Sequence, residues 1–122
     1  MSSSPLLPEA LYAGGVWMLE RDRPLDAAHF FRAMLLDQPE DERAWLGLGA
    51  CHENIAQDDE AFEIYLSGFV AARRKVRCGI AMSRVLRRRG EGDRAERALD
   101  MLDDLASSED LEPLLAEEKR AA

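Results

Sequence analysis

The residues of this chain whose types could support catalysis are few, with only two cysteines and two histidines in the sequence. Cys51 and His52 are adjacent, and adjacent side chains on a helix point about 100° apart, so the two make a poor nucleophile–base pair. The cysteines and histidines also lack the spacing of a zinc site. The acidic run Asp58-Asp59-Glu60 is typical of a helix start favoured by the helix dipole. We therefore expect no catalytic residue, no metal and no cofactor, and the protein is predicted not to be an enzyme.

A second chemically distinct feature is a run of arginine. The chain has 24 acidic and 16 basic residues and a net charge of −8, yet residues 73–97 alone hold ten basic and three acidic side chains. Fourteen of the basic residues are arginine, which binds carboxylates through a planar fork. The run is interpreted either as a solvated face that balances acidic helices or as an anchor for an acidic stretch of a partner. Nucleic acid is not expected, because no aromatic residues are interleaved to stack on bases.

Length and composition predict one domain of a cytoplasmic class. Its 122 residues are 47% apolar, which is enough to build a core. No apolar run approaches the ~18 residues of a membrane span, so stable membrane insertion is not expected. The first ten residues lack the basic and apolar regions of a secretory signal. Two cysteines cannot form a disulfide framework and suit a reducing compartment.

A spacing of 34 residues recurs along the chain in four sets of three residues of similar size. The sets are Gly15/Gly49/Ser83, Ala27/Ala61/Ala95, Phe31/Tyr65/Leu99 and Met18/His52/Leu86. Small residues let two helices cross closely, and a bulky residue one turn further on fills the space beside the crossing. The period and pattern are those of tetratricopeptide repeats, which are stacked pairs of antiparallel helices. We expect eight of these residues to pack the repeats together: Gly15, Ala27, Phe31, Gly49, Ala61, Tyr65, Ala95 and Leu99.

The predicted fold is therefore all-α, a right-handed solenoid of three tetratricopeptide repeats closed by a C-terminal capping helix. Residues 1–122 form one domain, with repeats at about 8–41, 42–75 and 76–108 and a cap at 109–122. Asp22 and Asp58-Asp59 are expected to cap helices, and Ser107-Ser108 to open the last one. Leu111, Leu114 and Leu115 are expected to cover the last repeat. The helices are predicted at about 8–21, 24–37, 41–55, 59–74, 76–89, 93–106 and 110–121.

The repeats resemble those of a known family, the class II chaperones of type III secretion (SycD/LcrH-like). Residues 11–15 (LYAGG) and 26–31 (DAAHFF) resemble the first repeat of that family, and residues 45–51 (WLGLGAC) resemble its second. The family reads roughly F-L-G-L-G-A-C there, and this string is the most specific part of the resemblance. Further matches follow at the expected distances, at Ala61-Phe62, Tyr65, Ser67, Gly68, Gly90 and Arg94-Ala95-Glu96. The resemblance covers about residues 10–106.

The resemblance implies a bacterial cytoplasmic chaperone without ATPase activity, which holds hydrophobic translocator proteins before their export by type III secretion. An extended client segment, often of the form P-x-L-x-x-P, would lie in the concave groove lined by the first helix of each pair. Repeat phase also places Gly47, Glu53, Ala81 and Arg88 on that surface. The residues predicted to contact the client are Tyr12, Ala13, Val16, Leu19, Leu46, Ala50, Ile80 and Arg84.

The sequence differs from the family in two respects, and two other functions are compatible with it. Fewer residues precede the first repeat than in the family, whose N-terminal extension is implicated in dimerisation, and the third repeat is rich in arginine. An exposed apolar groove still favours self-association as a homodimer. One alternative function is a co-chaperone of the needle subunit, which would bind an amphipathic helix. The other is a repeat scaffold or adaptor outside secretion, which would bind a folded domain through the arginine run.

Overall fold

The computed structural model describes residues 7–121, so residues 1–6 and 122 of the predicted domain lie outside the described part. Residues 7–121 form helices and turns without a strand, which confirms the all-α prediction. Helices adjacent in sequence pack against one another from α1 to α6, and α8 packs against α5, α6 and α7. The helices are α1 (Leu7–Glu20), α2 (Pro24–Asp37), α3 (Glu42–Asn54), α4 (Asp58–Ala71), α5 (Val76–Arg88), α6 (Gly92–Asp100), α7 (Asp103–Ser108) and α8 (Glu112–Ala121).

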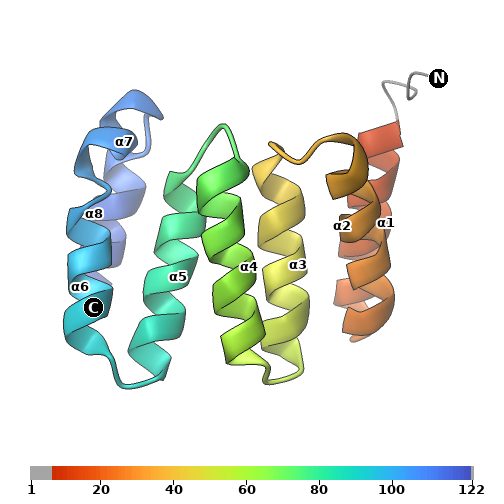
Figure 1. The fold of residues 1–122 in the computed structure, drawn as a ribbon, viewed down its shortest axis with the longest axis horizontal. Coiled ribbons are helices and arrows are strands. Elements are labelled where there is room, and N and C mark those ends of the chain that lie inside the picture. Colours follow the sequence, from red (N-terminus) through yellow and green to blue (C-terminus); the bar gives the residue numbers. More distant parts are fainter. Residues whose placement is uncertain (1–6, 122) are drawn as a thin grey trace.

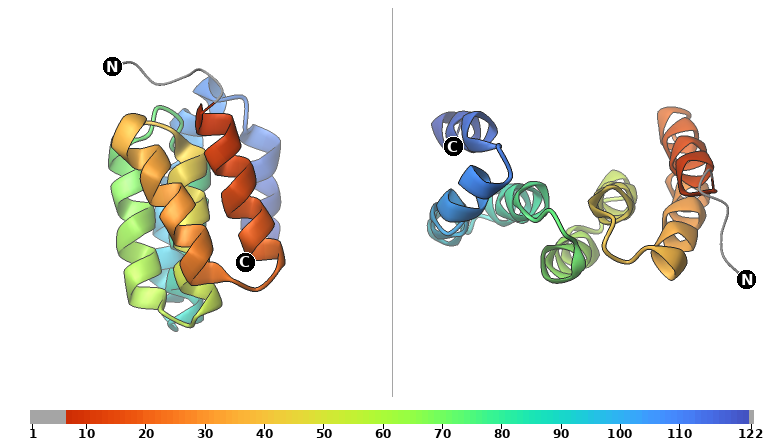
Figure 2. Two further views of the ribbon diagram at one scale, coloured as in Figure 1. Left: turned by 90° about the vertical axis from the view of Figure 1, so that its right-hand side faces the viewer. Right: turned by 90° about the horizontal axis from the view of Figure 1, so that it is seen from above.

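The helices stand side by side in one row, with α1 and α2 at one end and α6, α7 and α8 at the other (Figure 1). The row is curved. Seen from above, α1 and α8 flank α3 and α5 on one side, which we call the inner side (Figure 2, right). Contacts of α3 with α1, of α3 with α5 and of α5 with α8 connect the inner helices. The helices α2, α4 and α6 lie along the opposite, outer side.

The turns between the helices of each pair repeat with the same spacing of 34 residues. Asp22, Ala56 and Gly90 have positive φ angles of 57°, 58° and 80°. In each turn, the next backbone N–H donates to the carbonyl five residues back: Arg23 to Met18 (3.0 Å), Gln57 to His52 (2.9 Å) and Glu91 to Leu86 (2.9 Å). This is the hydrogen bond of a Schellman motif, which satisfies carbonyl groups at a helix end. The three residues of the set Met18/His52/Leu86 therefore supply the carbonyl oxygens that accept these hydrogen bonds.

Two predicted helix caps are wrong for this reason. Asp22 is the left-handed residue of the turn, and the N-cap position of α2 is Arg23, which makes no capping hydrogen bond. Asp58 and Asp59 lie in the first turn of α4, after an N-cap at Gln57. Acidic side chains in a first turn still interact favourably with the helix dipole.

The turns lead to a prediction about Ala56, because an L-residue with a side chain is strained in the left-handed conformation. We expect Ala56→Gly to raise the free energy of unfolding by about 0.5–1 kcal/mol. The matched change Gly90→Ala should lower it by a similar amount, since a Cβ there would meet no atom within 4 Å and the cost is one of backbone conformation alone. Urea denaturation of the two variants checks this, and shifts of the same sign would contradict it.

The third repeat and the cap differ from the prediction. The helix predicted at 93–106 is divided into α6 and α7, with turns at Met101 and Leu102. The Leu102 N–H donates to the Leu99 carbonyl three residues back (3.0 Å), which tightens the chain locally. As a result, Leu102 is buried while Met101 is 77% exposed. Neither glycine nor proline marks this break.

The cap is a helix pair rather than one helix. Ser107 and Ser108 belong to α7, and α8 begins only at Glu112. Asp110 has a φ of 58°, and the Leu111 N–H donates to the Ala106 carbonyl (2.8 Å), so this turn repeats the geometry of the other three. Leu115 is buried in a cluster with Ile80, Leu99 and Leu102, and Leu111 and Leu114 pack against that cluster. The cap thus covers the last repeat.

The core depends on glycines that face aromatic rings. A Cβ on Gly15 or on Gly47 would lie 2.5 Å from the Phe31 ring, so this ring fills the space between α1 and α3. A Cβ on Gly49 would overlap the Tyr65 ring in the same way. The eight predicted packing residues are all buried: Gly15, Ala27, Phe31, Gly49, Ala61, Tyr65, Ala95 and Leu99.

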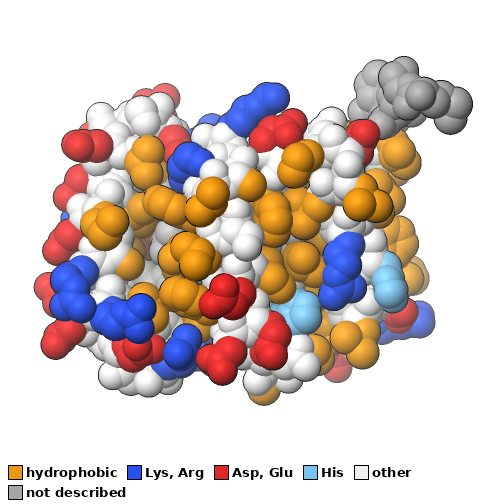
Figure 3. Space-filling model, in the orientation of Figure 1, with side chains coloured by type: hydrophobic (Ala, Val, Ile, Leu, Met, Phe, Trp, Pro, Cys, Tyr) orange, Lys and Arg blue, Asp and Glu red, His pale blue; other side chains and the backbone are white. Residues whose placement is uncertain are grey.

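The outer side also exposes apolar side chains. Leu36 on α2 is 90% exposed, Val70 on α4 is 71% exposed, and Leu25 on α2 is also exposed. Figure 3 shows hydrophobic side chains gathered over the middle of the face that carries α2 and α4. Among the described residues, no helix has the length and apolar character to cross a membrane.

Candidate functional site

The inner side carries a cleft of about 530 Å³ between α3, α5 and α8. Apolar side chains and charged side chains both line it. The apolar lining residues are Leu46, Ala50, Ile80, Ala81 and Leu114. The remaining lining residues, which carry charges or a hydroxyl, are Glu53, Tyr65, Arg77, Arg84 and Arg88.

Four of the eight predicted client contacts meet in this cleft. Leu46 and Ala50 are half-buried on α3, and Arg84 is exposed on α5. Ile80 also lines the cleft, but it is only 4% exposed and belongs to the core cluster beneath the cap. Its side chain therefore forms part of the floor of the cleft and leaves little surface for a ligand to contact.

The other four predicted contacts, Tyr12, Ala13, Val16 and Leu19, lie on α1 and do not line this cleft. Tyr12 and Leu19 are half-buried and pack against the core cluster around Phe31. The Tyr12 ring lies 6.3 Å from the Phe31 ring, and the Arg43 guanidinium carbon lies 4.8 Å from the centre of the Tyr12 ring. Val16 is half-buried and Ala13 is exposed.

The prediction assigned three of the lining residues to other roles. The sequence pattern places Tyr65 in repeat packing, Leu114 in the cap and Arg77 only in the arginine run, but all three line the cleft. Arg77 carried a signal, since it lies seven residues before Arg84 and therefore on the same helical face. The position of Leu114 depends on how α7 turns the chain, which no local pattern encodes.

A polar network closes one end of the cleft. The Tyr65 hydroxyl donates to Glu53 Oε1, and Arg88 Nη2 lies 2.7 Å from Glu53 Oε2 and 3.0 Å from Asp58 Oδ1. Burial, followed by this hydrogen bond to Glu53, raises the pKa of Tyr65 well above its ordinary value. Tyr65 therefore stays a neutral donor, and the network connects the helices α3, α4 and α5.

Helix α8 of the cap is held against α5 by a buried carboxylate. Glu118 on α8 is 6% exposed and accepts hydrogen bonds from Arg84 Nη2 (2.6 Å) and Arg84 Nε (3.1 Å). Arg87 Nη1 lies 3.5 Å from the other oxygen of Glu118. The hydrogen bond from Arg84 lowers the pKa of Glu118 below its ordinary value, which keeps the carboxylate charged.

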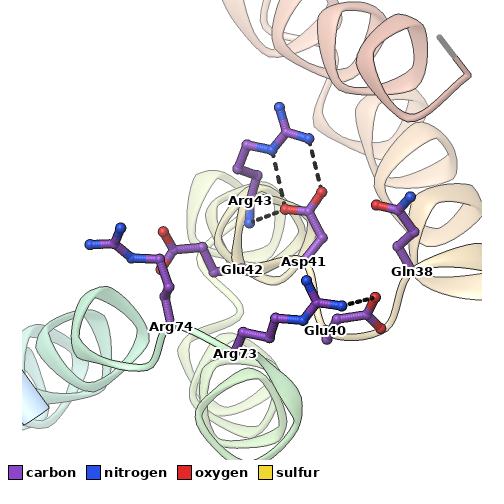
Figure 4. Close-up of a pocket in the computed structure, with 7 residues that line it drawn as sticks. All are labelled: Gln38, Glu40, Asp41, Glu42, Arg43, Arg73 and Arg74. Atoms are coloured by element: carbon purple, nitrogen blue, oxygen red, sulfur yellow. Dashed lines mark hydrogen bonds and ion pairs between the residues drawn. The ribbon is translucent and has the colours of Figure 1, made fainter. Parts of the chain in front are cut away.

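A second pocket of about 300 Å³, lined by polar and charged residues, lies where the α2–α3 and α4–α5 loops meet (Figure 4). Arg43 donates to Asp41 (2.9 Å), and the same guanidinium donates to Glu9 on α1 (2.9 Å). Burial acts to raise the pKa of Asp41, but the hydrogen bonds from Arg43 outweigh it, so the pKa is lowered. Arg73 lies 3.6 Å from Glu40 across the two loops. The charges of this pocket are thus engaged in ion pairs, either within the pocket or with neighbouring helices.

The two thiols lie in the protein core. Burial raises the pKa of Cys51 to about 11 and that of Cys78 to about 12, so both are neutral at physiological pH. His52 is half-buried, and its Nδ1 lies 2.7 Å from Gln57 Oε1. Within residues 7–121, no group of three histidine, cysteine or acidic side chains is placed to hold a metal ion. What the arrangement supports is binding by an apolar and arginine-lined cleft.

Comparison with known proteins finds several solved structures that are similar to this chain. No protein-family model matches the chain, and no curated protein matches it. The solved structure of PcrH from Pseudomonas aeruginosa, in complex with the chaperone binding region of PopB, matches with a TM-score of 0.82 and 26% identity, covering 98% of each chain. The secretion chaperone SycD from Yersinia enterocolitica, in complex with a peptide of the translocator YopD, matches with a TM-score of 0.76 and 28% identity. This match covers 98% of the present chain and 93% of SycD.

A further SycD structure, described as an alternative dimer, matches with a TM-score of 0.78 and 28% identity over 98% of this chain and 92% of that one. These matches extend over nearly the whole chain, including the cap. They confirm both the predicted fold class and the resemblance seen in the repeats.

Proposed function

We propose that this chain, which is similar along nearly its whole length to type III secretion translocator chaperones, is itself such a chaperone. It binds a hydrophobic translocator protein in its inner cleft and keeps that protein soluble and competent for secretion in the bacterial cytoplasm. The observation that supports this most is the match to PcrH over 98% of both chains, because that structure holds the chaperone binding region of a client.

The lining of the cleft fits an extended peptide. Leu46 and Ala50 are accessible on one wall, Ala81 and Leu114 on the other, and small side chains leave room for larger ones of the client. Burial of each leucine-sized side chain contributes about 1.5–3 kcal/mol before ordering costs. Proline in the client lowers that cost, since its unbound state is already restricted. Two or three such anchors give the moderate affinity that a chaperone needs in order to release its client.

We propose that the α1 residues extend this binding surface. Tyr12, Val16 and Leu19 are half-buried residues of α1, a helix of the inner side at the far end of the row from the cap. They would receive a second part of the client, with Ala13 allowing close approach. Without a client, the apolar inner side favours self-association of the chain as a homodimer.

Co-expression with a translocator encoded in the same gene cluster tests the function. We expect the wild-type chain to keep the translocator soluble and to co-purify with it. Leu46→Glu should abolish co-purification, because it buries a charge in the apolar wall. Leu36→Glu is the matched control, since Leu36 is 90% exposed on the outer side.

The result also separates the alternatives. A translocator that stays insoluble and does not co-purify would contradict the proposal. Capture of the needle subunit instead would favour the co-chaperone role. Binding of a folded domain that tolerates Leu46→Glu but is lost in high salt would favour the adaptor role.

A further inference from the structure

Two groups of arginines can be distinguished within the run in the structure. One group lies away from the cleft and forms ion pairs that join structural elements. Arg73 lies near Glu40, Arg74 near Glu109 and Arg89 near Glu91. The other group, Arg77, Arg84 and Arg88, lines the cleft. We call these three residues the arginine ladder.

The ladder has the spacing of an extended peptide. Its members lie at positions i, i+7 and i+11 of α5 and therefore share one helical face. At 1.5 Å per residue, neighbouring members are separated by about 10.5 Å and about 6 Å along the helix axis. An extended chain advances about 3.3 Å per residue, so these separations correspond to about three and about two residues of a bound segment.

The ladder keeps hydrogen-bond donors available although each member is already paired. The side chains of Arg77, Arg84 and Arg88 are 42%, 58% and 46% exposed. A guanidinium group has five N–H donors, and Arg77 reaches Glu42 through Nη1, while Arg84 reaches Glu118 through Nε and Nη2. Donors therefore remain on each of these two arginines.

The polar groups that line the cleft are mostly hydrogen-bond donors, which fit an acidic ligand. The side chains of the paired carboxylates Glu42 and Glu118 are only 14% and 7% exposed, and they are not part of the lining of the cleft in the described structure. The lining itself holds the three arginines and one carboxylate, Glu53, so the arginines offer the cleft their unused N–H donors, although their charges are balanced by carboxylates beside them. A guanidinium binds a carboxylate through two parallel charge-assisted hydrogen bonds.

We propose that the arginine ladder selects client segments that carry carboxylate side chains two or three residues apart, next to an apolar anchor. The anchor lies against Leu46, Ala81 and Leu114, and the acidic side chains reach Arg77 and Arg84. This inference rests on the proposed function, since it concerns the same cleft, and it specifies the sequence of the client.

Two synthetic peptides test the preference, Ac-PELEEP-NH2 and its isosteric amide counterpart Ac-PQLQQP-NH2. We expect calorimetry on the full chain at low salt to show binding about five- to twentyfold tighter for the acidic peptide. The ratio should fall towards about twofold at high salt, because screening weakens half-exposed ion pairs. Equal affinities, or tighter binding of the amide peptide, would overturn the ladder while leaving the proposed function standing. Failure of both peptides to bind would contradict the proposed function and the ladder together.

A paired variant shows whether the ladder is the source of the preference. Arg84→Gln combined with Glu118→Gln removes both charges and keeps a polar contact between α5 and α8. It is expected to reduce the acidic preference at least threefold. The matched control is Arg94→Gln with Glu91→Gln, an ion pair of 2.5 Å outside the cleft lining, which should leave the ratio unchanged. An unchanged ratio in the first variant would overturn the assignment.

Discussion

Replacing Phe31 by alanine is expected to lower the free energy of unfolding by about 3–5 kcal/mol, the largest effect of any single change considered for this protein. The Phe31 side chain is fully buried, and its ring occupies the space left by Gly15 on α1 and Gly47 on α3. Its loss opens a cavity that the helices cannot close without moving. Urea denaturation followed by circular dichroism measures the change. Leu36→Ala, on the same helix but 90% exposed, should stay within about 0.5 kcal/mol.

A double-mutant cycle tests the cause of this effect. Gly47→Ala alone is expected to be destabilising, because its Cβ would lie 2.5 Å from the Phe31 ring. In the Phe31→Ala background the ring is absent, so the same methyl group has room. The combined loss should therefore be smaller than the sum of the single losses by at least about 1 kcal/mol. Additive losses would show that the two residues do not share this space.

Replacing Glu118 by glutamine is expected to cost about 1–3 kcal/mol at neutral pH, because it leaves Arg84 and Arg87 without their buried carboxylate. The pKa of Glu118 is lowered from 4.5 in the folded chain. A depressed folded pKa gives stability that is complete above the unfolded pKa and is lost as the pH falls through the folded pKa. The difference between wild type and Glu118→Gln should therefore shrink below pH 4.5.

Thermal or urea unfolding at several pH values measures this dependence. The neighbouring change Glu117→Gln is the control, since Glu117 is exposed on the same helix. It should leave stability within about 0.5 kcal/mol at every pH. A Glu118→Gln variant as stable as wild type at neutral pH would show that the cap is held by its leucines alone.

The sequence was sufficient to predict the repeats because their packing is local and periodic. In two successive repeats a glycine faces an aromatic ring 16 residues further on, Gly15 with Phe31 and Gly49 with Tyr65. The structure confirms the all-α fold that this pattern predicts. The inner position of Leu46 and Ala50 followed from the same phase. These features need only contacts between neighbouring helices, which a repeat pattern records.

The features that the sequence did not predict depend on contacts without such a pattern. The break at Met101 has no glycine or proline, and it arises where Leu102 turns into the cluster beneath the cap. Asp22, Ala56 and Gly90 occupy the equivalent left-handed position in three successive turns, but glycine marks this position only in the third of these turns. The division of the arginines depends on which carboxylates lie opposite them. Glu118 lies one repeat length, 34 residues, after Arg84, but the residue one repeat length before Arg84 is Ala50, so the charges themselves do not recur.

In a row of helices that contact mainly their neighbours, the free energy of local unfolding differs from one helix to the next. The helices α3 and α4 each pack against a helix on both sides, whereas α1 and α8 lie at the ends of the row. Local unfolding in such a chain starts at the ends and costs less there than global unfolding. The α3 wall of the cleft thus belongs to the most persistent part of the molecule, whereas α8, which supplies Leu114 to the lining, belongs to the parts that open first. Opening of α8 alone would widen the cleft and leave Leu46 and Ala50 in place on α3.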